Sequence, residues 1–135
     1  MIVDTSALLA YFDAAEPSHQ VVSAAVESAV GPLVISPYVV AELDYLLLTR
    51  HGTHAEQAVL AELGAGAWEL ASMGQDRMRS AAALVRRYAD VPIGIADASN
   101  IVLAEAYRDR VIATLDRRHF SILRLSDGTA PTIVP

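Results

Sequence analysis

The first ten residues, MIVDTSALLA (residues 1–10), place a carboxylate directly behind a short apolar run. Residues 2–3 have the composition of a buried strand, and the apolar run that follows predicts a helix over about residues 6–12. Asp4 therefore lies where a strand ends and a helix begins, and Thr5 is the expected N-cap of that helix. In open parallel sheets, ligands bind outside the carboxyl ends of the strands, so Asp4 is a candidate site residue.

The remainder of the chain continues this alternation of strands and helices. Further helices are predicted over residues 17–30, 37–50, 53–63, 75–88 and 95–108, and further strands over residues 33–35, 67–70, 111–115 and 122–125. Ser36 followed by Pro37 is typical of an N-cap and a first helical position, and His51-Gly52 of a helix end. The alternation predicts an α/β fold in which helices cover both faces of a mainly parallel sheet.

Length and composition indicate one compact domain over residues 1–135. The chain has 135 residues, of which 53% are hydrophobic, enough for a sizeable core. No apolar run approaches the roughly 18 to 20 residues of a membrane span. The apolar strand at the start leaves no charged leader for a secretory signal, so we expect a cytoplasmic protein without a membrane contact.

The cysteine, histidine and charged-residue content limits the kinds of metal site and binding partner that the chain can have. There is no cysteine, and the four histidines lack paired metal-ligand spacing, so any metal is expected to bind mainly to oxygen. The net charge of −6 argues against a general nucleic-acid coat protein. All ten basic residues are arginine, however, and nine of them lie from Arg77 onward, so the second half carries the positive charge.

Three more carboxylates occupy positions comparable to Asp4. Glu42 lies on or beside the apolar face of the helix predicted over residues 37–50, and Asp97 begins an otherwise apolar helix. Asp116 directly follows the strand over residues 111–115. A buried carboxylate is costly unless it is paired or bound to a cation, so these four acids are expected to converge on a metal.

Oxygen ligands select Mg²⁺ or Mn²⁺, and a carboxylate-held ion of this kind suits in-line attack on a phosphodiester. The four acids, Asp4, Glu42, Asp97 and Asp116, therefore predict a metal-dependent nuclease. Arg117 and Arg118 directly follow the last of them and are candidates for holding the nucleic-acid backbone.

Four segments carry a more specific resemblance. IVDTSALLAYF, SPYVVAELDYLL, GIADASNIVLAEAY and VIATLDRRHFSIL resemble the four acidic motifs of the PIN domain, and more narrowly of VapC-type toxins of bacterial toxin-antitoxin pairs. Each motif alone is weak, but the four occur in the right order across almost the whole chain. The resemblance implies a three-layer α/β/α sandwich whose acidic site is Asp4, Glu42, Asp97 and Asp116.

The resemblance also implies an activity and partners. It implies a Mg²⁺- or Mn²⁺-dependent endoribonuclease that cleaves structured cellular RNA, tRNA or rRNA, and so inhibits translation and growth. It further implies a homodimer, a cognate VapB-type antitoxin that silences the toxin, and a higher toxin-antitoxin complex. The alternative within the same fold is a catalytically inactive module that binds RNA or protein.

Several neighbouring residues are candidates for supporting roles. A hydroxyl of Thr5 or Ser6 is expected either to bind a site carboxylate or simply to cap the helix. Asn100 is either a weak or water-mediated ligand or a surface residue, and Thr114 either points into the site or is a β-former. His119 is better explained as a structural or surface residue than as a general base, because a metal-bound water needs no such base.

Other functional classes fit the sequence less well. A phospho-accepting receiver domain needs a lysine, which this chain lacks. A dehalogenase-like phosphatase needs Asp-x-Asp, but Ser6 stands at the second aspartate. A metal-dependent adhesion module needs Asp-x-Ser-x-Ser, which Leu8 breaks. The apolar surplus around residues 21–26, 45–48 and 55–60 fits a dimer contact, an antitoxin groove or merely a generous core.

Overall fold

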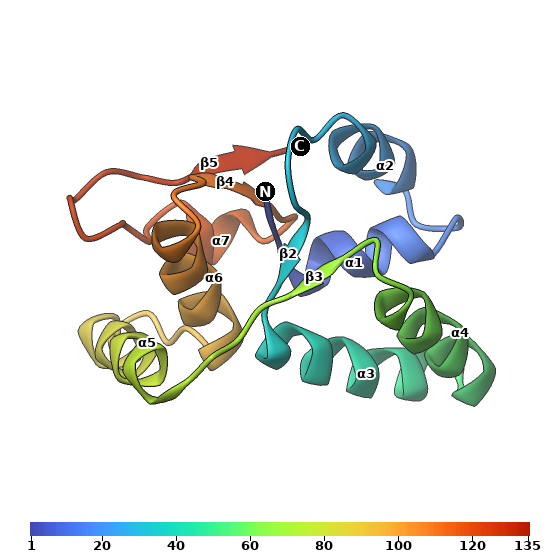
Figure 1. Cartoon of the computed structure of the whole chain (residues 1–135), viewed down its shortest axis with the longest axis horizontal. Helices are drawn as coiled ribbons and strands as arrows, with labels where there is room; N and C mark the ends of the chain where they lie inside the picture. The colour runs from blue at the N-terminus through green and yellow to red at the C-terminus, as the bar shows by residue number, and fades with distance from the viewer.

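The computed structural model describes all residues, 1–135, and contains one five-stranded sheet (Figure 1). The strands are β1 (Ile2–Val3), β2 (Val34–Ile35), β3 (Glu69–Leu70), β4 (Val111–Ala113) and β5 (Thr132–Val134). Their spatial order is β3-β2-β1-β4-β5, and every pair of neighbours is parallel. The predicted α/β class and parallel sheet are therefore confirmed.

Seven helices surround this sheet. They are α1 (Thr5–Phe12), α2 (His19–Glu27), α3 (Pro37–His51), α4 (Thr53–Gly64), α5 (Gln75–Arg87), α6 (Ile95–Ala106) and α7 (Arg117–Phe120). The longest, α3, has 15 residues, and none offers an apolar segment that could span a bilayer.

The helices form a layer on each face of the sheet because successive strand residues point to opposite faces. Val3 and Ile35 pack in one apolar cluster with α1, α2, α3 and α4. Ile2 and Val34 pack in a second cluster with α5, α6 and the residues around α7. Figure 1 shows the two groups of helices on opposite sides of the strands, with α6 lying close to β4. The result is the expected three-layer arrangement.

Two helix starts decide where the site lies. Asp4, and not Thr5, is the N-cap of α1, because its carboxylate accepts from the Ser6 backbone N–H at 3.4 Å. Ser36 caps α3 as predicted, with Pro37 at the first helical position. Both caps directly follow a strand, so both helices begin at the carboxyl edge of the sheet.

The prediction for the C-terminal part was wrong in one element. Residues 122–125 are not a strand; Leu123 and Leu125 are buried in the core as irregular chain. A turn at Gly128, with φ of 82°, reverses the chain, and residues 132–134 pair with β4 instead. The apolar run therefore reflects burial and not strand pairing. Helix α2 is also shorter than the predicted 17–30 range.

Candidate active site

The order of the strands indicates where the site lies, because the sheet extends in opposite directions from β1. Strands β2 and β3 extend to one side of β1, whereas β4 and β5 extend to the other. In sheets of this order, the crevice outside the carboxyl ends of the two central strands is where ligands bind. Asp4 follows β1 and Thr114 follows β4, and the Asp4 backbone N–H donates to the Ala113 carbonyl at 2.9 Å.

Asp4 is a buried carboxylate held by three neutral side chains. It is only 4% exposed. The Asn100 amide donates to its Oδ1 at 3.0 Å. The hydroxyls of Ser6 and Thr114 each lie 2.8 Å from its Oδ2 and donate to it. Hydrogen bonds to a carboxylate stabilise by about 1.5–3 kcal/mol each, so this set fixes Asp4 in one orientation.

Glu42 reaches the same place from α3. The apolar face of this helix is buried through Val39, Leu43 and Leu47, while Glu42 itself is exposed. The Thr5 hydroxyl donates to Glu42 Oε2 at 2.5 Å. Of the two positions that the sequence left open, the margin of the apolar face is the one observed, so Glu42 forms the outer rim of the site.

Asp97 stands in the first turn of α6. Its Oδ2 accepts from the Gly94 backbone N–H at 2.9 Å, which closes a capping box. Burial raises the pKa of the Asp97 carboxyl above its ordinary value of 3.8. The charges of Asp4 and Asp116 raise this pKa further, while the Gly94 bond and His119 lower it. Burial and the two neighbouring carboxylates therefore disfavour a negative charge on Asp97 unless a cation is bound.

Asp116 follows β4 and caps the short helix α7. Its Oδ1 accepts from the His119 backbone N–H at 3.1 Å. The His119 ring nitrogen Nδ1 lies 2.9 Å from Asp116 Oδ2 and 3.4 Å from Asp97 Oδ2. One oxygen of each of these two carboxylates and Nδ1 all lie within 4.8 Å of one another, which is compatible with a shared metal ion.

All four predicted acids line one hollow of about 300 Å³. Its lining residues are Asp4, Thr5, Ser6, Leu9, Glu42, Leu46, Arg50, Asp97, Asp116 and His119. The structure thus brings the acids together at the carboxyl edge of the sheet, with Thr5, Ser6, Asn100 and Thr114 in contact with them. Their roles in metal binding and catalysis stay predictions. Four carboxylates in one hollow are the donor set that Mg²⁺ and Mn²⁺ prefer.

The two candidate RNA-binding arginines differ. Both are exposed on α7 beside the hollow. The Arg117 guanidinium donates to the Pro135 carbonyl at 2.8 Å, so it is already engaged within the chain. Arg118 forms no side-chain hydrogen bond or ion pair in the structure, which leaves it free to bind a phosphate. Its role stays a prediction.

Two polar lining residues, Arg50 and His119, were not predicted as site residues from the sequence. His119 was expected at the surface or in a structural role, because a metal-bound water needs no general base, and the four-residue α7 shows no helical period that would have placed it in the hollow. Arg50 lies two turns beyond Glu42, and Glu42, Leu46 and Arg50 share one helix face at steps of four residues. This spacing was visible in the sequence and would have identified Arg50.

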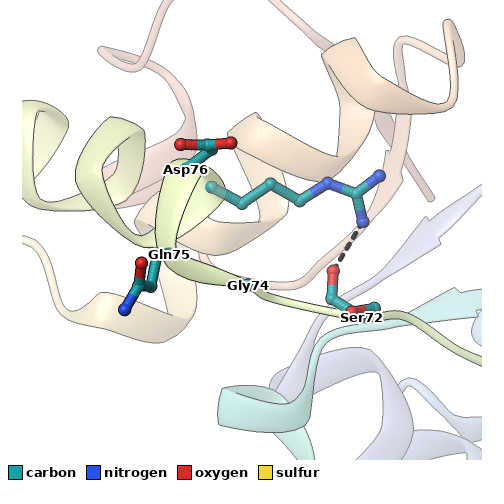
Figure 2. A pocket seen from close by; sticks show the side chains of 5 residues that line it. Ser72, Gly74, Gln75 and Asp76 are labelled. Atoms are coloured by element: carbon teal, nitrogen blue, oxygen red, sulfur yellow. Dashed lines mark hydrogen bonds between the residues drawn. The ribbon is translucent and has the colours of Figure 1, made fainter.

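A larger hollow, of about 490 Å³, lies at the start of α5 (Figure 2). It contains a single carboxylate, Asp76, and the Arg77 guanidinium there donates to the Ser72 carbonyl at 2.5 Å. This hollow lacks converging acids or any unpartnered buried polar group. Volume therefore does not identify the site; side-chain chemistry does.

Comparison with known proteins agrees with this geometry. Residues 1–124 match the family described as PIN domain. The chain is 61% identical, over its whole length and that of its relative, to Ribonuclease VapC26 of Mycobacterium tuberculosis strain H37Rv. The crystal structure of M. tuberculosis VapC20, a Sarcin-Ricin loop cleaving toxin, superposes with a TM-score of 0.83 at 19% identity and covers 99% of this chain and 98% of that one. A toxin-antitoxin complex from Klebsiella pneumoniae superposes with a TM-score of 0.71 at 19% identity, and the match covers 99% of this chain and 95% of that one. The two structures share the fold of this chain.

Proposed function

The chain belongs to the PIN domain family, and from this premise we propose that it is a VapC-type toxin, a metal-dependent endoribonuclease that cleaves tRNA or rRNA and so stops translation. The observation that carries the proposal is the convergence of four carboxylates from β1, α3, α6 and the end of β4 on one hollow. The identity of 61% to a ribonuclease over the whole chain supports the same activity.

The proposed cofactor is Mg²⁺ or Mn²⁺, bound by Asp4, Asp97 and Asp116, with Glu42 at the rim. Such an ion, when bound, supplies a Lewis acid and lowers the pKa of a water molecule so that it can attack a phosphodiester. The raised pKa of Asp97 supports this proposal: burial is its main cause and the charges of Asp4 and Asp116 add to it, and a bound cation would offset both effects.

Other residues of the chain are proposed to position the metal-binding carboxylates and the RNA. Ser6, Asn100 and Thr114 hold Asp4 in one orientation, so this ligand needs no reorganisation when the ion binds. Thr5 orients Glu42 at the rim, where an exposed carboxylate can adjust to metal and substrate. Arg118 is proposed to bind an RNA phosphate beside the scissile bond.

The partners are also proposals. Helices α3 and α4 leave Tyr45, Leu48 and Leu60 exposed, Tyr45 by 65%. Val21 on α2 is likewise exposed. These apolar side chains support a contact with another chain, either a second copy or a VapB-type antitoxin. We expect the protein to act in the cytoplasm, because that is where its proposed RNA substrates are.

The test is sequencing of new RNA 5′ ends after total bacterial RNA is incubated with the protein, with and without Mg²⁺ or Mn²⁺. A few sharp metal-dependent cuts are expected, and they would also identify the substrate. Asp97→Asn is the control: it removes a charge without changing side-chain volume, so the cuts should disappear while the fold remains. Equal cutting by the variant would contradict the site assignment. No new ends, with metal binding confirmed, would favour the alternative of an inactive PIN module that binds RNA or protein.

A further inference from the structure

One ring nitrogen in the hollow has no explained role. The Nδ1 atom of His119 is shielded from solvent and makes no directed hydrogen bond, although two carboxylate oxygens lie near it. The backbone that carries the ring is fixed on both sides. The His119 backbone N–H donates to Asp116, and the next residue, Phe120, is 1% exposed in the core. The His119 side chain is 21% exposed, but its Nδ1 atom is enclosed and faces two carboxylates, so a positive ion shared by all three would give this nitrogen a partner.

The distances suit a shared ion. Ligand atoms at adjacent corners of an octahedron lie about 3.0 Å apart when each is about 2.1 Å from the metal. Nδ1 lies 2.9 Å from Asp116 Oδ2 and 3.4 Å from Asp97 Oδ2, so both separations are close to this value. A neutral ring with its proton on Nε2 presents a lone pair at Nδ1, as a ligand must.

We propose that His119 Nδ1 is a direct nitrogen ligand of the divalent cation, beside Asp97 and Asp116, and that this ligand makes the site prefer Mn²⁺ to Mg²⁺. The inference rests on the proposed function, because it assigns a ligand to the metal proposed there. Imidazole binds first-row transition-metal ions, Mn²⁺ included although it binds least tightly of them, better than it binds Mg²⁺, which favours oxygen ligands and retains its water. An all-carboxylate site would show less of this preference. The sequence-based expectation of oxygen ligands is thus extended by one nitrogen.

The direct test is pulsed electron paramagnetic resonance of Mn²⁺ bound to the full chain. A coordinated imidazole nitrogen modulates the Mn²⁺ echo, and the modulation changes when histidine alone carries ¹⁵N. Only His119 among the four histidines lines the hollow, so the labelled protein needs no substitution. A histidine-dependent nitrogen signal supports the inference. Bound Mn²⁺ without that signal, or binding of Mg²⁺ but not of Mn²⁺, overturns the inference and leaves the proposed nuclease intact, whereas failure to bind either ion overturns both.

Calorimetric titration of two variants provides a second test. In His119→Gln, the affinity for Mn²⁺ is expected to fall roughly tenfold or more and the affinity for Mg²⁺ to fall less, so that the ratio of the two decreases. His54→Gln is the matched control, because His54 is exposed on α4 away from the hollow. Circular dichroism verifies that each variant is folded. An unchanged Mn²⁺ to Mg²⁺ ratio in folded His119→Gln would contradict the proposal.

Discussion

At the scale of single residues, the site combines one well-supported carboxylate with three less constrained ones. Asp4 is enclosed by donors from α1, α6 and the end of β4, whereas Glu42 has one hydroxyl partner and lies at the rim. This asymmetry suggests that Asp4 fixes the position of the metal, and that the outer acids adjust to it. Loss of a donor to Asp4 should therefore impair the site even though the carboxylate itself remains.

Thr114→Val tests this support. The substitution keeps the shape of the side chain but removes the hydroxyl that donates to Asp4 and accepts from the Asp116 backbone N–H. We expect a loss of about 1–3 kcal/mol in the free energy of unfolding and a 10- to 100-fold fall in the RNA cleavage rate. Thr132→Val, at an exposed position in β5, is the control and should keep both near their original values. Unchanged cleavage by Thr114→Val would show that Asp4 needs no such support.

Asp97 provides a prediction about pH. Burial first, and then the charges of Asp4 and Asp116, raise its pKa in the folded protein. Between the unfolded and the folded pKa, the folded state binds more protons, so its stability without metal falls as the pH rises through that window. Metal-free Asp97→Asn should accordingly be more stable than the original protein at pH 7, and this advantage should disappear as the pH falls below the ordinary value of 3.8.

Denaturant unfolding in the presence of a chelator, at several pH values, measures this difference. The single tryptophan, Trp68, is buried against Tyr11 and Phe12 and reports unfolding by its fluorescence. Asp90→Asn, at an exposed position, controls for the loss of one negative charge. If Asp97→Asn were less stable than the original protein at pH 7 without metal, burial of a charged Asp97 would not be destabilising the metal-free fold.

At the scale of the helices and strands, the start of α3 joins the two helical layers. The Ser36 hydroxyl accepts from the Tyr38 backbone N–H at 3.2 Å and lies 2.7 Å from the Ser99 hydroxyl on α6. Both serines are fully buried. Helix α3 carries Glu42 and α6 carries Asp97, so this contact fixes two elements of the site relative to each other.

Ser36→Ala should remove this contact and the N-cap together. We expect it to lower the free energy of unfolding by about 1–2 kcal/mol, the usual cost of losing a side-chain cap. Ser80→Ala is the control, because Ser80 is exposed within α5 and should change stability by less than about 0.5 kcal/mol. Urea midpoints followed by Trp68 fluorescence measure both. Equal effects of the two substitutions would mean that the Ser36 cap contributes nothing specific.

The sequence predicted elements well where an apolar run ended at a clear start or stop signal. Ser36-Pro37 and Gly52 bounded α3 as expected, and Asp4 directly followed β1. Strand β4 ended at Ala113, two residues earlier than predicted, so Asp116 does not follow it directly. The failures depended on tertiary contacts. Residues 122–125 are apolar because they fill the core, and the four residues of α7 are too few to show a period. His119 therefore could not be assigned to the site from the sequence, whereas the four acids could.

At the scale of the whole molecule, the negative charge of the protein disfavours binding of the proposed RNA substrate. The net charge is −6, and four of the acids gather in one hollow, so an RNA phosphate would be repelled there without a cation. Exposed arginines on α7 and at the end of α3 lie around that hollow. Binding of a divalent ion should consequently change both substrate affinity and the stability of the fold.

The stability of the whole chain should therefore depend on Mn²⁺ or Mg²⁺. An ion that binds the folded state alone stabilises it by about 2.7 kcal/mol at 100 times its dissociation constant, which corresponds to a rise on the order of 10 °C in Tm for a domain of this size. The double variant Asp4→Asn, Asp97→Asn lacks two proposed ligands and should lose most of this rise. Thermal unfolding followed by Trp68 fluorescence, with sodium chloride at matched ionic strength as the control for screening, distinguishes specific binding from a general salt effect. An equal rise in sodium chloride, or an undiminished rise in the double variant, would show that the four acids do not form a metal site.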